Sequence, residues 1–327
     1  MEKRKVIIDC DPGIDDSLAL MLALQSPELD IVAITIVCGN VPVQQGAENA
    51  LKVLSWHHRL DIPVYMGAEK PLKVAYVDAM DTHGMDGLGE SNYPQVTEAR
   101  PHKDAVAFLK KTLQDAIAME EKISIIALGP FTNLAQVLMQ DASLKDGIES
   151  CVSMGGSYKS HGNCSPVAEY NYWCDPDAAK FVYETMSVHM IGLDVTRKIV
   201  LTPNILEYMC KVSPFIGTRI KRITRFYIDF HWKQEGVIGC VINDPLAVAY
   251  FLDETICTGF SSYTQIETEG ISRGQSVVDA YDFYGHAHNS YILTKTDSLR
   301  FMKMFFERVF DVKEADSEAV LSQIMVL

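Results

Sequence analysis

The chain has 327 residues, of which 29 are Lys or Arg and 43 are Asp or Glu, and its formal net charge is -14. Hydrophobic residues make up 48% of the sequence, which is typical of a globular protein with a large core and excludes a disordered chain. Because an acidic surface repels polyanions, we expect no nucleic-acid partner and no anionic membrane partner, and a neutral or cationic small molecule or a metal ion fits better.

No linker rich in Ser, Gly or Pro and no internal repeat divides the sequence, so we expect a single domain over residues 1–327. The start, MEKRKVIID, lacks the apolar run of a signal peptide, and no later stretch reaches the roughly 18 uncharged residues of a membrane helix. The eight cysteines form no C-x-x-C pair and lie mostly in apolar segments, which favours buried free thiols. We therefore expect a cytoplasmic protein.

Short β-branched runs that end in Gly, Asn or Asp alternate with segments of helical spacing. The predicted strands are 6–11, 31–40, 123–130, 149–156 and 189–196. The predicted helices are 46–60, 105–119 and 175–186. Continuous apolar strands that alternate with helices indicate a mostly parallel sheet covered on both faces, which is the doubly wound α/β class.

The last third of the chain departs from this alternation and predicts a helical and hairpin elaboration. After residue 196 the pattern is mostly helical, 261–283 alternates in the manner of a hairpin, and 301–315 predicts a terminal amphipathic helix. In a doubly wound fold, ligands bind beyond the carboxyl ends of the strands. We therefore expect the chemistry at the polar residues that end the predicted strands.

The stretch VIIDCDPGIDD, residues 6–16, follows an apolar run with four aspartates. Asp15 and Asp16 would each stabilise a helix N-terminus by roughly 0.3–1 kcal/mol. Asp9 and Asp11 at the strand tip, however, would raise each other's pKa and oppose folding. A hard cation removes this conflict, and several clustered carboxylates favour Ca²⁺ over the smaller Mg²⁺. The motif therefore predicts a calcium site.

Two enzyme classes open on a strand of this kind. Asp9-Cys10-Asp11 matches the D-x-D motif of haloacid-dehalogenase-type phosphatases, whose first Asp is the nucleophile, but Pro12-Gly13 is foreign to that motif. DCDPGIDDSLAL instead closely resembles the N-terminal fingerprint of the nucleoside hydrolases, the inosine/uridine-preferring ribonucleoside hydrolase family. The agreement continues in register at VCGN (37–40), ALGPFTNLA (127–135), MGG (154–156), GNCSPVAEYNYWCDPDAA (162–179) and NDPLAVAY (243–250).

The resemblance implies a Ca²⁺ cofactor and a set of ligands for it. These ligands would be the carboxylates of Asp11, Asp16 and Asp244 and the main-chain oxygen of Leu128. Asp11 would also be the general base that takes a proton from a metal-bound water as this water attacks C1′ of the sugar. Asp9 would support the loop that carries these ligands without contacting the ion itself.

The same resemblance implies the sugar contacts, which would be Asp15, Asn40, Met154, Asn163, Glu169, Asn171 and Asp244. Asn and Glu side chains supply the donors and acceptors that ribose hydroxyls need. The spacing of Asn163, Glu169 and Asn171 predicts a loop and a strand edge that present alternate side chains to one cleft.

The sequence departs from the family at residue 243. Many members carry a His before the late Asp, where it protonates the departing base, whereas this chain has Asn243 before Asp244. Asparagine does not titrate near neutral pH and cannot be a general acid. Asn243 would therefore contact the base, while His83 or His231 would replace the missing acid. The wall of the base pocket would include aromatic residues, for which the candidates are Phe226, Tyr227 and Trp232.

We therefore predict Ca²⁺-dependent hydrolysis of the N-glycosidic bond of ribonucleosides to ribose and free base, by a homodimer or homotetramer as is common in that family. Two alternatives stay open. One is the phosphatase, which turnover of a phosphate ester would reveal. The other is a catalytically silent nucleoside- or ribose-binding protein, in which Asn243 marks the loss of chemistry.

Overall fold

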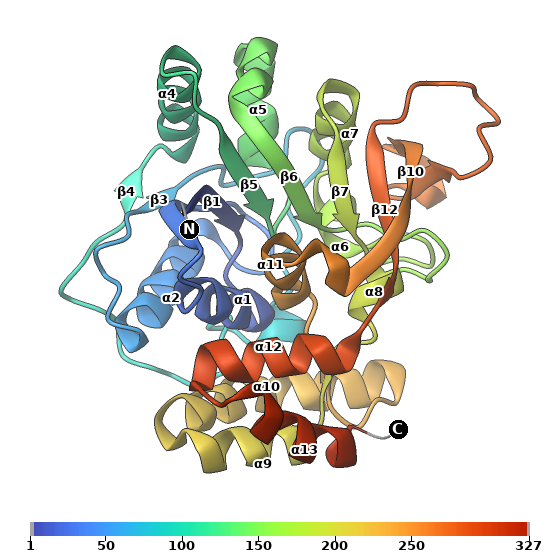
Figure 1. Cartoon of the computed structure of the whole chain (residues 1–327). Coiled ribbons are helices and arrows are strands. Elements are labelled where there is room, and N and C mark those ends of the chain that lie inside the picture. Colours follow the sequence, from blue (N-terminus) through green and yellow to red (C-terminus); the bar gives the residue numbers. More distant parts are fainter. Residues whose placement is uncertain (1–2, 326–327) are drawn as a thin grey trace.

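A computed structural model describes residues 3–325 of the chain and shows a ten-stranded sheet between layers of helices (Figure 1). The strands of this sheet are β1 (Arg4–Cys10), β2 (Leu29–Ile36), β3 (Val64–Met66), β4 (His102–Lys103), β5 (Ile123–Ala127), β6 (Ile148–Met154), β7 (Val188–Ile191), β10 (Cys257–Ile266), β11 (Ser276–Asp279) and β12 (Ser290–Thr296). A separate antiparallel pair consists of β8 (Val200–Leu201) and β9 (Cys240–Val241).

The strand order is β11-β10-β12-β7-β6-β5-β1-β2-β3-β4. β1 pairs in parallel with both β2 and β5, and the chain winds outward through β2, β3 and β4 on one side and through β6 and β7 on the other. Only the hairpin end is antiparallel, where β10 pairs with β11 and β12. The predicted doubly wound, mostly parallel class is confirmed. In such folds the switch point, here between β1 and β5, is where ligands bind.

Helices cover both faces of the sheet, as Figure 1 shows. One face carries α4 (Ala105–Ala118), α5 (Thr132–Gln140) and α7 (Pro176–Thr185), and the other carries α1 (Ile14–Leu24), α2 (Val43–Trp56), α11 (Asp244–Leu252) and α12 (Ser298–Phe310). Alternate residues of β1 divide between the two cores, because Val6 and Ile8 face α1 and α2 whereas Ile7 faces α4 and α5.

Shorter or peripheral elements complete the chain. The remaining helices are α3 (Met80–His83), α6 (Tyr170–Cys174), α8 (Leu193–Thr196), α9 (Pro203–Val212), α10 (Pro214–Glu235) and α13 (Glu314–Ile324). The 3₁₀ turns are Ala142–Gly147, Glu254–Ile256 and Gly270–Ser272. α6 and α8 follow β6 and β7, and α10 lies along the side of the sheet occupied by α1, so these three elements surround the switch point.

Several details differ from the prediction. The strand expected at 189–196 ends at Ile191, and Leu193–Thr196 form the helix α8. The hairpin expected at 261–283 is confirmed as β10 and β11, but the terminal helix expected at 301–315 is wrong at its end. α12 stops at Phe310 because Asp311 has a left-handed φ of 56°, and α13 follows. All eight cysteines are free, yet Cys164 is exposed and Cys210 half-buried, so the expectation of buried thiols is wrong for these two.

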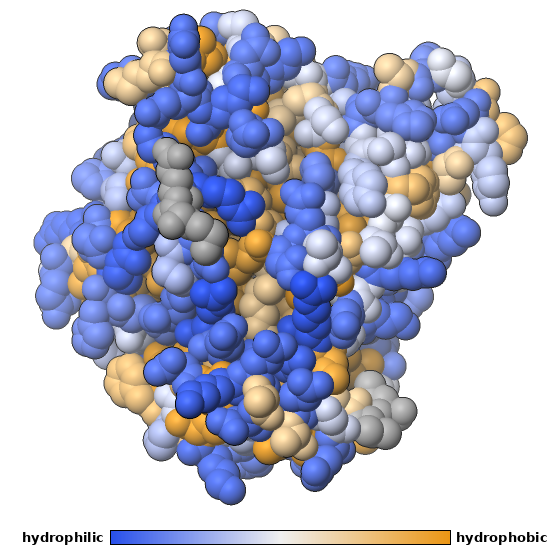
Figure 2. Space-filling view, viewed as in Figure 1, coloured by the Kyte–Doolittle hydropathy of each residue, from blue (hydrophilic) through white to orange (hydrophobic). Residues whose placement is uncertain are grey.

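The surface agrees with the composition. The face drawn in Figure 2 is mainly hydrophilic, with apolar side chains scattered between charged ones. Within residues 3–325, none of the helices combines the length and the apolarity that a membrane crossing requires.

Candidate active site

A cavity of about 330 Å³ opens at the carboxyl ends of the central strands, beside the switch point. The predicted site residues that line it are Asp15, Asn40, His83, Leu128, Met154, Asn163, Glu169, Asn171, His231, Asn243 and Asp244. The other two, Asp11 and Asp16, are fully buried and contact the cavity residue Asn40. All thirteen predicted residues therefore gather in one place.

The turn at Pro12-Gly13 carries the chain from β1 into α1 and folds Asp16 back over the strand end. Asp16 accepts hydrogen bonds from the Gly13 amide at 3.0 Å and from the Asp11 amide at 3.2 Å, so it caps the helix. Asp11 accepts one from the Asn40 amide through Oδ2 at 2.6 Å. Its buried Oδ1 has no partner within residues 3–325. A buried acceptor of this kind calls for a ligand.

Asp9 lies outside the cavity. Its Oδ1 accepts hydrogen bonds from Thr35 Oγ1 at 2.5 Å and from Asn133 Nδ2 at 2.8 Å, which ties β1 to β2 and to α5. Burial raises the pKa of Asp9 to about 6, against the two hydrogen bonds, which lower it. The phosphatase interpretation requires Asp9 as an accessible nucleophile, and its buried position disfavours that interpretation.

Three carboxylates converge at the floor of the cavity. Asp15, Asp16 and Asp244 each place an oxygen within 4.8 Å of the other two, and all three are buried. Burial, followed by the neighbouring aspartate charges, holds the pKa of Asp244 well above its usual range. The hydrogen bonds to Asp11, Asp15 and Asp16 come from backbone amides, Asn side chains and the Tyr227 hydroxyl, which are neutral donors. A buried, oxygen-only, negative cluster fits a hard divalent cation.

The cluster differs in one member from the predicted ligand set, because Asp15 stands in it beside Asp16 and Asp244. Asp11 is nevertheless close, because its amide donates to Asp16 Oδ1 at 3.2 Å and Asn40 donates to both side chains. Burial and then the charge of Asp16 raise the pKa of Asp11 well above its usual value. The Leu128 carbonyl oxygen accepts a hydrogen bond from an Asn171 amide at 2.6 Å. A carbonyl oxygen has two lone pairs, so one is left for a cation.

Glu169 and Asn171 lie at the start of α6, so the expectation of a strand edge is wrong. Glu169 caps this helix and accepts hydrogen bonds from the amides of Asn171 and Gly156, each at 2.9 Å. Burial raises the pKa of Glu169 to about 7, against these hydrogen bonds. Asn171 also donates to the Met154 carbonyl oxygen at 3.0 Å, which joins the ends of β5 and β6.

Two buried histidines form another wall, and backbone contacts fix them in opposite tautomers. His83 Nδ1 accepts a hydrogen bond from the Ile14 amide at 3.1 Å, so its proton is on Nε2. His231 Nδ1 donates to the Tyr227 carbonyl oxygen at 2.9 Å, so its Nε2 carries a lone pair. Burial lowers the pKa of both rings, which keeps them neutral at pH 7. The cavity therefore has a donor at His83 and an acceptor at His231.

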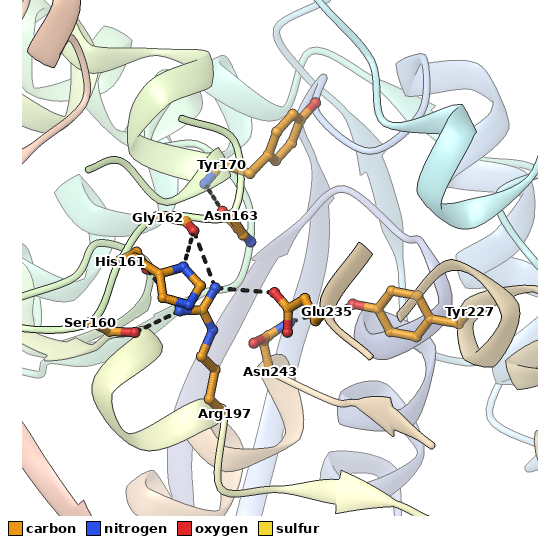
Figure 3. Close-up of polar contacts among 9 residues, drawn as sticks. All are labelled: Ser160, His161, Gly162, Asn163, Tyr170, Arg197, Tyr227, Glu235 and Asn243. Carbon is orange, nitrogen blue, oxygen red and sulfur yellow. Dashed lines mark hydrogen bonds and ion pairs between the residues drawn. The ribbon is translucent and has the colours of Figure 1, made fainter. Parts of the chain in front are cut away.

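Asn243 contacts Asp15 through its side-chain nitrogen, whereas its buried Oδ1 has no partner within residues 3–325 and can still accept a hydrogen bond from a ligand. Its Nδ2 donates to Asp15 Oδ2 at 3.0 Å and lies 3.4 Å from the Tyr227 hydroxyl, which Figure 3 shows beside it. Of the three aromatic candidates, Tyr227 lines the cavity, whereas Phe226 does not and Trp232 is 58% exposed.

Sequence reasoning missed an ion pair at the cavity wall. Arg197 and Glu235 both line the cavity, and Arg197 Nη2 lies 3.1 Å from Glu235 Oε1 (Figure 3). Arg197 comes directly after the predicted strand 189–196, which is the one signal for it in the sequence. Its partners lie 35 to 38 residues away, too far for any local pattern to indicate them.

Known proteins resemble this chain over nearly its whole length. The sequence model of the inosine-uridine preferring nucleoside hydrolase family matches residues 6–303. The chain is 34% identical over 307 residues to the pyrimidine-specific ribonucleoside hydrolase RihA of Escherichia coli, and the match covers 93% of this chain and 97% of that protein. The protein of the same name from Salmonella typhimurium is 35% identical over 307 residues, with the same coverage.

Solved structures share the fold. A plant nucleoside hydrolase superposes with a TM-score of 0.87 at 28% identity, covering 94% of this chain and 99% of that one. The purine-preferring ribonucleoside hydrolase from Gardnerella vaginalis has a TM-score of 0.86 at 30% identity, covering 97% and 100%. These findings confirm the resemblance carried by the aspartate motif: the chain belongs to the inosine-uridine preferring nucleoside hydrolase family and is an enzyme of that type.

Proposed function

We propose that the enzyme hydrolyses the N-glycosidic bond of ribonucleosides to ribose and free base, with Ca²⁺ at the aspartate cluster and Asp11 as general base. The observation that carries the proposal is the buried Oδ1 of Asp11, which has no partner within residues 3–325 and stands beside a cluster of three uncompensated carboxylates. Asp16, Asp244 and the Leu128 carbonyl oxygen would hold the ion together with Asp11. When bound, the ion would supply Lewis-acid activation of water and a positive charge against the sugar oxygens.

The chain's own groups divide the remaining work. Asp11 is fixed through Oδ2 by the Asn40 amide, so its free Oδ1 is placed to take a proton from the attacking water. Asp15 is oriented by Asn243 and faces the cavity, where it would accept a hydrogen bond from a ribose hydroxyl. Asn40, Met154, Asn163, Glu169, Asn171 and Asp244 would complete the sugar contacts.

The departing base needs a hydrogen-bond donor, and the tautomers support His83. Its Nε2–H is left for a ligand, whereas His231 offers a lone pair and Asn243 donates to Asp15. A neutral imidazole is a weak acid, yet as a fixed donor it stabilises negative charge that develops on the base. We therefore propose that His83 donates the hydrogen bond to the departing base and that His231 contacts the base as an acceptor.

The proposed substrates are uncharged ribonucleosides. Acidic side chains at Asp78 and Asp81 line the cavity along with the aspartate cluster, so a 5′-phosphate would be repelled. Named relatives include pyrimidine-specific and purine-preferring hydrolases, and both classes of base belong in the test panel. The cytoplasmic location and the homodimeric or homotetrameric state stay predictions.

The test is the release of reducing sugar from a panel of purine and pyrimidine ribonucleosides, with and without a calcium chelator. We expect turnover by the wild type, loss of turnover with the chelator, recovery on adding Ca²⁺, and no turnover by Asp11→Ala. Asp30→Ala, at an exposed position on β2, is the matched control and should behave as wild type. Nucleoside binding by calorimetry without sugar release would favour the binding protein, and phosphate release from a chromogenic ester would favour the phosphatase.

A further inference from the structure

Loop 158–163 ends at the cavity and is held by the segment that follows β7. Asp194, in α8, accepts hydrogen bonds from three successive backbone amides of this loop. Their donors are Tyr158, Lys159 and Ser160, at 2.7, 2.7 and 3.0 Å. One carboxylate thus fixes the first half of the loop through its N–H groups.

Arg197, directly after α8, holds the second half of the loop by donating hydrogen bonds to oxygen atoms of the loop. Nη1 donates to Ser160 Oγ at 2.7 Å and to the His161 carbonyl at 2.9 Å, and Nη2 donates to the Gly162 carbonyl at 3.2 Å (Figure 3). Because a guanidinium is planar and its donors are rigidly spaced, these bonds set the direction in which the chain enters Asn163. A lysine could not make them together.

The same guanidinium reaches across to another element. Glu235, its partner at 3.1 Å, is the last residue of α10, and the two side chains are only 16% and 23% exposed. A carboxylate at a helix C-terminus is unfavourable with the helix dipole, so the favourable contact of Glu235 is the one with Arg197. His231 lies one turn earlier on α10 and lines the cavity.

We propose that Arg197 is a positioning residue that locks loop 158–163 to the last turn of α10, so that Asn163 and His231 meet one substrate at a fixed separation. Asn163 Oδ1 accepts a hydrogen bond from the Tyr170 amide at 2.9 Å, which leaves its Nδ2 for a ligand. The inference rests on the proposed function for the identity of that ligand. Arg197 itself acts through Asn163 and touches no reacting atom.

The lock is tested first without substrate, by hydrogen–deuterium exchange. In Arg197→Met we expect faster exchange of the amides of loop 158–163 and of the last turn of α10. Arg308→Met is the matched control, because Arg308 pairs with Glu28 at 2.7 Å and the two side chains are 26% and 31% exposed. The control should leave exchange in loop 158–163 unchanged. Unchanged exchange in Arg197→Met would overturn the proposal whatever the activity.

The second test asks whether Arg197 acts through Asn163. On the best ribonucleoside, Arg197→Met should raise KM about tenfold with kcat changed less than about twofold, and Arg197→Lys should not restore KM. Asn163→Ala should raise KM by a similar factor, and the double variant should raise it no further than one of the single variants. Multiplying KM effects would show that the two residues act independently and would overturn the positioning role.

A third variant tests the lock in case Arg197→Met does not fold. Glu235→Gln keeps the size of the side chain and removes its charge, so we expect faster exchange in the last turn of α10 with loop 158–160 still held by Asp194. Exchange unchanged in that turn contradicts the lock. If the wild type binds nucleosides but releases no sugar, the proposed function fails, while the exchange data and the calorimetric affinities of the same variants still decide the role of Arg197.

Discussion

The side-chain amide of Asn243 lies 3.0 Å from Asp15 Oδ2, and the backbone amide of Asn243 lies 3.3 Å from the same oxygen. One residue at the start of α11 thus donates two hydrogen bonds to a carboxylate at the start of α1. Because Asp15 also belongs to the aspartate cluster, the residue that departs from the family pattern orients a group at the centre of the site.

Removing the side-chain hydrogen bond from Asn243 to Asp15 should lower activity, although it removes no general acid. Asn243→Ala should lower kcat/KM about 10- to 100-fold, because a hydrogen bond to a charged group contributes about 1.5–3 kcal/mol. Steady-state kinetics on the best ribonucleoside measures the loss, and the pH profile should keep its shape because Asn243 does not titrate. A profile that loses one limb in this variant would contradict the assignment.

His83 and His231 should respond differently to the quality of the leaving group. His83→Ala should lower kcat on natural ribonucleosides by about 10²- to 10⁴-fold, because the departing base loses its donor. On p-nitrophenyl riboside, whose leaving group needs no such help, the loss should disappear. His231→Ala is the paired comparison and should mainly raise KM. Equal losses on both substrates in His83→Ala would argue against its role at the base.

Because of its buried carboxyl groups, the metal-free protein should be more stable in mild acid than at neutral pH. Asp9 has a pKa of about 6 and Glu169 one of about 7, compared with 3.8 and 4.5 for the free groups. Between about pH 4 and pH 7 the folded state binds more protons than the unfolded state, so the free energy of unfolding falls as pH rises through this window. Chelator-treated protein should therefore resist urea better at pH 5 than at pH 7.5.

Asp9→Asn tests this origin because asparagine does not ionise. The variant should reduce the difference in free energy of unfolding between the two pH values by about 1.4 kcal/mol, because only the roughly one pKa unit between pH 5 and the Asp9 pKa of about 6 contributes in this range. Asp30→Asn, at an exposed position, should leave the difference as in the wild type. A protein that becomes steadily more stable from pH 5 to pH 7.5 after chelation would refute the expectation.

Calcium should stabilise the wild type, and Asp244 should decide by how much. At a free Ca²⁺ concentration about 100 times its Kd, we expect a gain of about 2.7 kcal/mol in the free energy of unfolding. Asp244→Asn removes one buried charge, so its metal-free form should be more stable than the metal-free wild type while its gain from Ca²⁺ shrinks. Thermal unfolding with and without Ca²⁺ measures both quantities. An equal gain in wild type and variant would remove Asp244 from the ligand set.

The sequence predicted the parts of the fold whose signal is local. β1, β2, β5, β6 and β7 are four to eight residues long and overlap the apolar runs that predicted them, and the alternation with helices specifies their parallel pairing. β3 has three residues and β4 two, which is too short for any periodicity to appear. β12 has seven residues but includes Thr294, Lys295 and Thr296, so it does not read as an apolar run.

The candidate site also divides into features that a local sequence signal predicts and features that it does not. The aspartate motif and the matched segments predicted thirteen residues that lie together around one cavity, and those at strand ends meet there because the strand ends of a parallel sheet converge. The lock at Arg197 and the opposite tautomers of His83 and His231 could not be read from the sequence. The lock at Arg197 and the tautomer of His83 depend on backbone groups of distant segments, such as the Ile14 amide, and a backbone group leaves no side-chain signature. The tautomer of His231 depends on the Tyr227 carbonyl one turn earlier on α10, and that hydrogen bond is likewise not visible in the residue types.

The position of β1 has a consequence for biosynthesis. This strand is made before the other strands of the sheet, yet it lies at the centre of the sheet. Its aspartate cluster is completed by a segment 228 residues later, where Asn243 contacts Asp15. At about 5–20 residues per second, the nascent chain carries the acidic turn for on the order of ten seconds or more before that segment exists. For about the first half of this time β5 (Ile123–Ala127) has not been made either, so one edge of β1 has no strand to pair with. Newly made chains are therefore the form most in need of chaperones, and the catalytic centre can be completed only after Asn243 and Asp244 have been made.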